Sequence, residues 1–414
     1  MKTIRGLNKD YWLYWFASSA SMAASNILQY VLSLYVLEIT GSATLFASML
    51  SVIIFPRLLL TPIAGVAADR VKKIRFMSWI VFGEGVVLAI YCIFGNFFSL
   101  QLPWIYLLVI VLEMGEVFYS GPAAAILPEL VTEDKLKDAI SVSKVDDGIV
   151  VVIAPIAAAF IYETLTLSWA FGIVAGLNFF ACVLQKLIRP KYEAKRNDAD
   201  KKTTYVADFK EGISCIGNDK FLRVFIKVLP VVDAFFGATF SVSVLYLLRE
   251  SYQLSSYAYG IYCSVTACMS MIIPIFVVPI VKKYPAGKIF SISTMLIAIE
   301  IAGIGVCAFL GVNGLIPIMV SVVLITILDC MTIAEAIPMQ MASSILLQTG
   351  VEKEKLGRVS SVISMAAIAG VAAGEMLFGF LNDITNVWIP IFVGAAGVGA
   401  ASLVYWKKLL KENK

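Results

Sequence analysis

The strongest constraint on this chain is a series of long apolar stretches separated by short charged turns. A helix that crosses a bilayer needs about 20 predominantly apolar residues. Six stretches of this kind fall in each half of the chain. We predict membrane-spanning helices at residues 11–37, 44–67, 76–95, 103–127, 140–162, 165–188, 224–248, 257–281, 288–310, 314–340, 358–382 and 387–406. The sequence therefore predicts an all-α membrane protein with twelve transmembrane helices.

The composition agrees with a lipid surrounding. Hydrophobic residues make up 60% of the chain and charged residues 15%, which is more apolar surface than one water-soluble core can bury. The first apolar stretch is about 27 residues long and lacks a small-residue cleavage site, so we expect no cleaved signal peptide. The basic residues flank the membrane spans, and we therefore expect the bilayer, and no nucleic acid, as a partner.

The two halves of the sequence repeat one another. Residues 131–136 match residues 351–356, and residues 160–163 match residues 380–383, each pair 220 residues apart. We expect two six-helix bundles, 1–188 and 224–414, joined by the charged linker 189–223. Within this linker, residues 206–216 have apolar side chains at helical spacing, which indicates an amphipathic helix on the membrane surface.

Lysine and arginine give the orientation. They gather at both termini, in the linker and in every second turn, and the opposite turns contain essentially only Arg249. By the positive-inside rule, both termini and the linker face the cytoplasm.

A motif follows the second span. It reads Pro62-Ile-Ala-Gly-Val-Ala-Ala-Asp-Arg-Val-Lys-Lys-Ile-Arg75, and its Gly65 permits close helix packing. Glycine followed by Asp69 and Arg70 at this place resembles the signature of the major facilitator superfamily. Residues 122–131 and 356–359 add a narrower resemblance to the bacterial branch that holds macrolide-efflux proteins and enterobactin exporters.

The resemblance implies a fold of two six-helix pseudo-repeats in a bacterial cytoplasmic membrane. It also implies a gating role for Gly65, Asp69 and Arg70, and a central cavity lined by helices one, four, seven and ten. Two departures stand against it. The equivalent loop of the second half, 281–288, lacks the Asp-Arg pair, and Ala154 precedes Pro155 where the efflux motif has glycine.

Several charged residues lie near the middle of the predicted spans, where each costs about 2.5 to 3.5 kcal/mol on insertion scales. Such groups usually face a protein interior or a wet cavity. The charged candidates for substrate or proton binding are Arg57, Glu113, Glu116, Asp233, Asp329 and Glu335. The first span adds Asn26, Gln29 and Tyr30. A cavity lined by acids favours a cationic substrate, and a carboxylate can exchange its proton for the charge of that substrate.

Other interpretations of these charges remain. Arg57 pairs with a cavity acid or contacts substrate, and the acids bind substrate and protons or form buried pairs alone. For Glu84 and Glu300, on the third and ninth spans, we favour helix-to-helix hydrogen bonds or a dimer contact over transport.

The sequence predicts a secondary active transporter, a proton-coupled exporter of amphipathic, cationic small molecules that works by alternating access. A lipid or lysolipid flippase or a siderophore exporter is the alternative, and a non-transporting membrane sensor is the more distant one. We expect no enzyme activity, no metal site and no cofactor beyond the proton gradient. We also expect a monomer.

Overall fold

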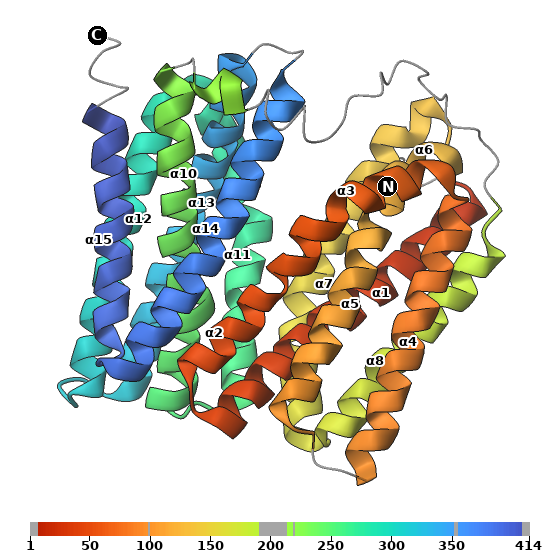
Figure 1. Ribbon diagram of the computed structural model, residues 1–414. Coiled ribbons are helices and arrows are strands. Elements are labelled where there is room, and N and C mark those ends of the chain that lie inside the picture. The colour runs from red at the N-terminus through yellow and green to blue at the C-terminus, as the bar shows by residue number, and fades with distance from the viewer. Residues whose placement is uncertain (1–6, 98–99, 190–212, 218–219, 352–354, 408–414) are drawn as a thin grey trace. The chain divides into compact units, whose positions relative to one another are not determined.

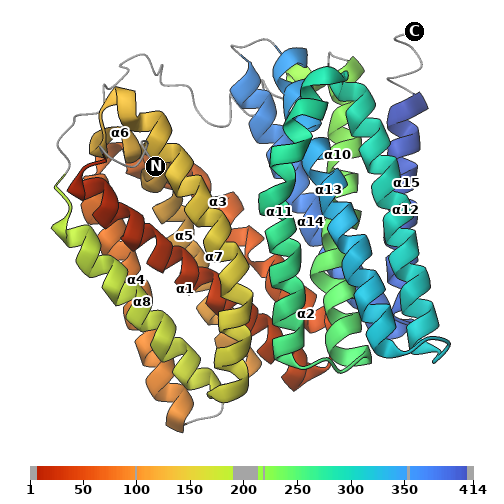
Figure 2. The same ribbon diagram turned by 180° about the vertical axis from the view of Figure 1, so that it is seen from behind.

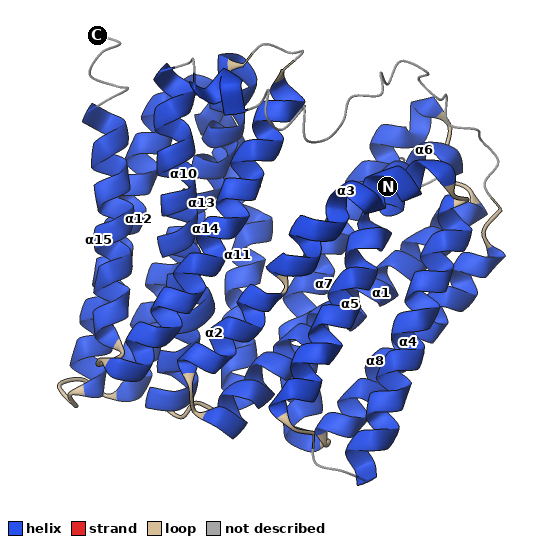
Figure 3. Cartoon of the chain, in the orientation of Figure 1, coloured by secondary structure: helices blue, strands red, loops and turns tan. Residues whose placement is uncertain are grey.

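The computed structural model describes residues 7–97, 100–189, 213–217, 220–351 and 355–407. Within these ranges the secondary structure consists of helices joined by turns, and no strand is present (Figure 3). Twelve helical segments are long and apolar enough to cross a membrane, and each overlaps one predicted span. The predicted all-α architecture with twelve spans is therefore confirmed.

The helices of the first half are α1 (Lys9–Thr40), α2 (Ala43–Val52), α3 (Ile54–Arg70), α4 (Lys73–Phe97), α5 (Leu102–Ala125), α6 (Leu127–Leu130), the 3₁₀ turn η1 (Glu133–Lys135), α7 (Leu136–Thr164) and α8 (Leu167–Leu187) (Figure 1). Those of the second half are α10 (Lys220–Ala238), its π-helical continuations η2 (Thr239–Val244) and η3 (Leu247–Ser251), α11 (Ser256–Lys283), α12 (Ala286–Val312), α13 (Ile318–Gly350), α14 (Leu356–Ile384) and α15 (Trp388–Tyr405). In the linker, residues 213–217 are helical. The rest of the predicted amphipathic helix, 206–216, lies outside the described residues.

The predicted span 44–67 consists of two helices. α2 ends at Val52, and α3 begins at Ile54. Pro56 has no N–H to donate to the carbonyl of Val52, and its ring crowds that carbonyl. The proline thus explains why the helix is interrupted at Ile53.

The start of α2 is set by its own sequence. Gly41 has a φ of 59°, which lets the chain turn sharply after α1. Ser42 is the N-cap residue, and its hydroxyl oxygen accepts a hydrogen bond from the backbone N–H of Leu45 at 3.2 Å. A serine at this position typically stabilises a helix by about 1 kcal/mol.

The chain forms two compact units. Unit 1 comprises Met1–Glu38, Phe55–Asp200 and Ser256–Ser264, and unit 2 comprises Ile39–Ile54, Lys201–Ser255 and Val265–Lys414. α2 therefore belongs with helices of the second half, and the first turns of α11 belong with helices of the first half. The predicted boundaries 1–188, 189–223 and 224–414 follow the sequence repeat and remain a prediction.

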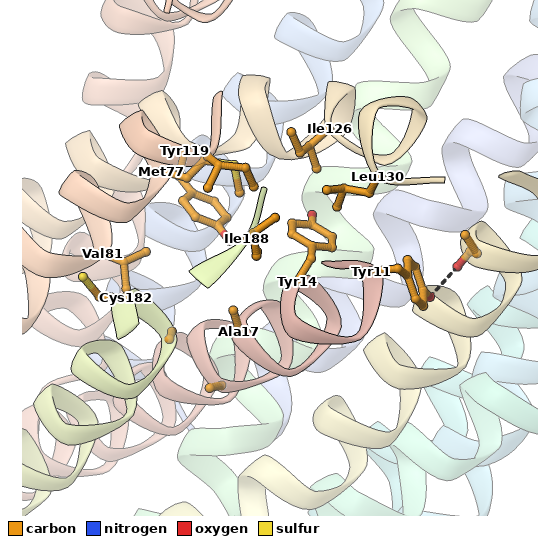
Figure 4. Packing of buried hydrophobic residues seen from close by; sticks show 14 of the residues in the cluster. Tyr11, Tyr14, Ala17, Met77, Val81, Tyr119, Ile126, Leu130, Cys182 and Ile188 are labelled. Atoms are coloured by element: carbon orange, nitrogen blue, oxygen red, sulfur yellow. Dashed lines mark hydrogen bonds between the residues drawn. The ribbon is translucent and has the colours of Figure 1, made fainter. Parts of the chain in front are cut away.

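The core of unit 1 gathers near the start of α1 (Figure 4). Tyr11 of α1, Met77 of α4, Tyr119 of α5 and Leu130 of α6 pack together there. The hydroxyl group of Tyr11 donates a hydrogen bond to the carbonyl of Ala139 in α7 at 2.9 Å. This bond satisfies a buried polar group and fixes α1 to α7.

Small residues bring helices close together in unit 2. A Cβ atom added at Gly370 of α14 would lie 2.7 Å from the carbonyl oxygen of Pro230 in α10. One added at Gly374 would lie 2.5 Å from the carbonyl oxygen of Ala234. The close packing of α10 on α14 therefore requires glycine at both positions. On another side of unit 2, α12 packs against both α13 and α15 (Figure 2).

Two helix contacts, one in each unit, repeat each other. In unit 2, the carboxylate of Asp383 in α14 accepts hydrogen bonds from the backbone N–H groups of Ala43 (2.7 Å) and Thr44 (3.0 Å) in α2. In unit 1, the carboxylate of Glu163 in α7 accepts one from the backbone N–H of Tyr257 in α11 at 2.9 Å. Asp383 and Glu163 are 220 residues apart, which is the offset of the sequence repeat.

A second pair of hydrogen bonds follows the same repeat. The hydroxyl of Ser51 in α2 donates to the carbonyl of Ala372 in α14 at 3.2 Å. The hydroxyl of Ser264 in α11 donates to the carbonyl of Val152 in α7 at 2.7 Å. The two acceptors are again 220 residues apart. The predicted pseudo-repeat therefore extends to individual hydrogen bonds, and we name these two helix pairs, α2 with α14 and α11 with α7, the twin contacts.

Candidate functional site

The charged groups of unit 1 meet where α3, α4 and α5 pack together. Arg57 of α3 forms an ion pair with Glu113 of α5. The Glu113 side chain is 9% exposed, and the Arg57 side chain is 49% exposed. Because a carboxylate without a partner is costly in apolar surroundings, the guanidinium offsets part of the cost of burying the Glu113 carboxyl group. The predicted pairing of Arg57 with an acid is confirmed.

Two further carboxylates lie beside this ion pair. Glu116, one turn after Glu113, is exposed on α5 and has electrostatic interactions with Glu113 and Arg57. Glu84 of α4 interacts with both glutamates of α5. Gly115 makes room for it, since an added Cβ atom there would collide with Glu84 Oε1. Among the described residues of unit 1, three carboxylates thus gather beside one guanidinium, which interacts with Glu113 and Glu116.

Polar groups continue from this cluster into the core. The hydroxyl of Tyr119 accepts a hydrogen bond from Gln185 Nε2 of α8 at 3.4 Å, and Tyr119 has electrostatic interactions with Glu84 and Glu116. Gln185 is fully buried, and its Oε1 atom has no hydrogen-bond partner among the described residues. An acceptor left in this way costs free energy, as is often seen at functional sites.

The predicted polar residues of the first span lie along α1. Asn26 donates a hydrogen bond to the carbonyl of Met22 within the same helix at 2.9 Å. Gln29 is exposed. Tyr30 is partly buried and has an electrostatic interaction with Cys263 of α11. Among the described contacts, none joins these three side chains to the acid cluster, so their role in substrate binding remains a prediction.

The predicted acids of unit 2 occupy different surroundings. Asp233 is partly buried on α10. Asp329 of α13 is 5% exposed. Glu335, six residues further along α13, accepts a hydrogen bond from Ser293 of α12 at 2.8 Å. Glu335 therefore faces α12.

Glu300 of α12 joins Glu335. It is buried and has electrostatic interactions with Glu335 and Thr332 of α13. Its Oε2 atom has no hydrogen-bond partner among the described residues. The helix-to-helix hydrogen bond expected for Glu300 remains a prediction. Its proximity to a second carboxylate was not predicted.

The predicted gating residues Gly65, Asp69 and Arg70 lie in the last turns of α3. Their backbone is helical, and their side chains lie outside the described residues, so the gating role remains a prediction. In the part of the chain that the structure describes, no group of three or more cysteine, aspartate or glutamate side chains has the geometry of a metal site.

The family follows from the sequence as a whole. The sequence profile of the Major Facilitator Superfamily matches residues 14–367. This chain belongs to the Major Facilitator Superfamily. The twelve helices that are long and apolar enough to cross a membrane agree with this membership.

Two bacterial relatives are similar in sequence to this superfamily member. Macrolide efflux protein A of Streptococcus pyogenes is 25% identical over 229 residues, which cover 53% of this chain and 54% of that protein. The uncharacterized MFS-type transporter YfiS of Bacillus subtilis is 24% identical over 354 residues, which cover 84% of this chain and 81% of that protein. The chain thus spans about half the length of the macrolide efflux relative.

Solved superfamily structures show the same fold. The nucleoside transporter NupG matches with a TM-score of 0.77 at 12% identity and covers 97% of this chain and 99% of its own. A bacterial homologue of the iron transporter ferroportin, in its inward-facing state, matches with a TM-score of 0.70 at 15% identity. The match covers 96% of this chain and 98% of that chain.

Glu84 and Glu300 are the site residues that the sequence interpretation assigned to other roles. They lie on α4 and α12, the third spans of the two halves, and each interacts with an acid on the fourth span. The available signal was their similar depth in corresponding spans. Hydropathy alone does not give the rotation of α4 or α12, and so it could not place these side chains beside α5 and α13.

Proposed function

We propose that this superfamily member is a proton-coupled secondary exporter of amphipathic, cationic small molecules that works by alternating access. The observation that carries the proposal is the cluster on α3, α4 and α5, where Glu84, Glu113 and Glu116 accompany the single guanidinium of Arg57. Excess negative charge attracts a cation. When the cationic substrate leaves a carboxylate, the carboxylate can bind a proton in its place. Transport of the substrate and transport of protons are thereby coupled.

The direction of transport is the second part of the proposal. The similarity to a protein named for macrolide efflux, at 25% identity, favours export. In bacteria a proton gradient directed into the cell drives an exporter when each proton that enters replaces a substrate that leaves. We also propose that the protein is a monomer in the bacterial cytoplasmic membrane. Both termini lie in the cytoplasm in this proposal, because lysine and arginine gather in the turns on that side.

A lipid or lysolipid flippase and a siderophore exporter remain the alternatives. An acidic cluster repels an anionic headgroup or an anionic siderophore, so the charge of the cluster favours a cationic substrate over both. A non-transporting sensor would give no flux at all.

Flux in liposomes tests this function. Liposomes that contain the purified protein and have an acidic interior should accumulate the cationic dye ethidium and release protons. A protonophore should dissipate the pH gradient and stop the accumulation of the dye, and Glu113→Gln or Asp233→Asn should abolish the dye-dependent release of protons. An anionic dye of similar size serves as the control.

Three outcomes would contradict the proposal. Accumulation of ethidium that the protonophore leaves unchanged would exclude proton coupling. Faster accumulation of the anionic dye would favour the flippase or siderophore alternative. In intact cells, higher ethidium accumulation on expression would indicate import.

A further inference from the structure

Glu300 is a buried carboxyl group that the proposed function does not use. It lies midway along α12 and is 9% exposed. The hydroxyl of Thr332 on α13 donates its hydrogen bond to the carbonyl of Leu328 at 2.9 Å, and Glu300 Oε2 has no partner among the described residues. A buried charged oxygen without a partner is costly. A proton bound there removes the charge.

In the part of the chain that the structure describes, no cation is found among the groups that interact with Glu300. On α13 the interacting group is Glu335, which has the same charge, and the neighbouring titratable residues of that helix are Asp329 and Cys330. On α15, the other helix that packs against α12, the titratable residue is Tyr405. Two carboxyl groups of like charge in apolar surroundings repel each other, and a proton on either of them relieves the repulsion.

Unit 1 contains the same arrangement. Glu84 lies on the third span of its half, as Glu300 does, and interacts with Glu113 and Glu116 on the fourth. Arg57 is already engaged by Glu113. The titratable groups on the neighbouring stretches of α3, α5 and α8 are Arg57, Glu113, Glu116, Tyr119, Cys182 and Lys186. Lys186 lies over aromatic rings of α4, and it forms no ion pair with Glu84 in the described part of the chain.

We propose that Glu84 and Glu300 are proton-binding residues, one in each half of the chain, and that each exchanges its proton with the glutamate beside it, Glu116 or Glu335. The transfer runs from a carboxyl group to a carboxylate. One O–H bond breaks and another forms, so the charge of each pair is unchanged. The role in transport rests on the proposed function, but the protonation of these side chains does not.

The two pairs give the transporter two internal proton stores. In unit 1 the inner acid, Glu84, is partly buried and the outer acid, Glu116, is exposed. In this scheme Glu116, the more exposed acid, takes up the proton, and Glu84 holds it while Glu116 binds the cation. In unit 2, Glu335 has the role of Glu116, and the buried Glu300 has the role of Glu84.

Infrared spectroscopy tests the protonation directly. Protein in dodecyl maltoside, a detergent without carbonyl groups, should show the carbonyl stretch of protonated carboxyl groups at pH 7. Glu84→Gln and Glu300→Gln should each lose part of this band. Glu84→Asp and Glu300→Asp should retain it, because each keeps a titratable carboxyl group. Glu250→Gln, at the end of η3, is the matched control and should leave the band unchanged. A band of full intensity in both glutamine variants would overturn the inference.

Flux tests the role in transport. In the ethidium assay, either glutamine variant should release about half as many protons per dye molecule as the parent protein, because one of the two stores is lost. An unchanged ratio in both variants would overturn the role. If the parent protein moves no ethidium, the proposed function fails, whereas the infrared result still decides whether Glu84 and Glu300 hold protons.

Discussion

At the scale of single residues, the missing side chain of Gly115 gives Glu84 its place beside α5. The Glu84 side chain on α4 lies against α5 at a position where α5 has no side chain. Gly115 provides this space, and Glu84 Oε1 occupies it. The charge distribution of the cluster therefore depends on a residue that has no charge.

Gly115→Ala should destabilise the protein by no more than about 1 kcal/mol, because the added methyl group collides with the Glu84 carboxyl group, which ends a flexible side chain and can move away. In a Glu84→Ala background the space is free, and the same substitution should stabilise the protein by up to about 1 kcal/mol, because alanine is the better helix former. Thermal unfolding of the four proteins in detergent measures this coupling.

Gly83→Ala provides the control for this cycle. Gly83 neighbours Glu84 on α4, and a Cβ atom added there meets nothing within 4 Å. This substitution should stabilise the protein by the same amount, about 0.5–1 kcal/mol, in both backgrounds. Equal costs of Gly115→Ala with and without Glu84 would show that the two residues do not interact.

The pairing of Arg57 with Glu113 could be predicted from the sequence, because a charge buried in a membrane span requires a partner. The contact between Glu84 and α5 could not. It depends on how α4 is rotated against α5, and a helix that is apolar on most faces carries little sequence information about its rotation.

At the scale of helices, the twin contacts each combine a carboxylate with a close approach of two backbones. A Cβ atom added at Gly379 of α14 would lie 2.8 Å from the carbonyl oxygen of Ala43 in α2. One added at Gly260 of α11 would lie 2.9 Å from the carbonyl oxygen of Pro155 in α7. Each glycine lets the neighbouring acid reach the first turn of a helix, where free N–H groups favour an anion.

Asp383→Asn should speed amide hydrogen exchange in the first turn of α2, because it removes the negative charge of the carboxylate that accepts hydrogen bonds from the N–H groups of this turn. Glu163→Gln should do the same in the first turn of α11. We expect about a fivefold increase in exchange rate for each, equivalent to about 1 kcal/mol. Mass spectrometry of the peptides around Ala43 and Tyr257 measures both.

The two variants serve as controls for each other. Asp383→Asn should leave the peptide around Tyr257 unchanged, and Glu163→Gln should leave the peptide around Ala43 unchanged. Slow exchange of both peptides in both variants would mean that the carboxylates do not stabilise these helix starts.

The repeat of residues 160–163 in residues 380–383 marked both acids in the sequence, and the structure gives them equivalent roles. What each acid contacts could not be predicted. The helix start that binds Asp383 lies 340 residues away in the chain, and hydrophobic periodicity gives the faces of a helix without naming the partner.

At the scale of the whole molecule, the number of spans was the most predictable property, because each span must be long and apolar to cross the bilayer. The composition of the two compact units was not predictable. α2 belongs to the unit of the second half, and the first turns of α11 belong to the unit of the first half, because of packing between segments that are distant in the sequence. The interruption between α2 and α3 was not predicted either, since residues 44–67 were expected to form one span.

The orientation can be tested by chemical labelling in a background without the seven native cysteines. Asn313→Cys, in the exposed turn between α12 and α13, should react with a membrane-impermeant maleimide on intact cells. Thr132→Cys, in the exposed turn between α6 and η1, should react only after the cells are permeabilised. The opposite pattern would place both termini outside the cell.

The long separation between Asp383 and α2 also imposes an order of events during synthesis. A ribosome that adds about 5–20 residues per second needs on the order of a minute or less to pass from Ala43 to Asp383. Until then, the first turn of α2 has only the hydroxyl of Ser42 as a cap. Glu163, by contrast, is already made when Tyr257 emerges, since 94 residues separate them and the acid comes first. The start of α11 can thus bind its carboxylate as soon as it is synthesised, whereas the start of α2 lacks its carboxylate for most of translation.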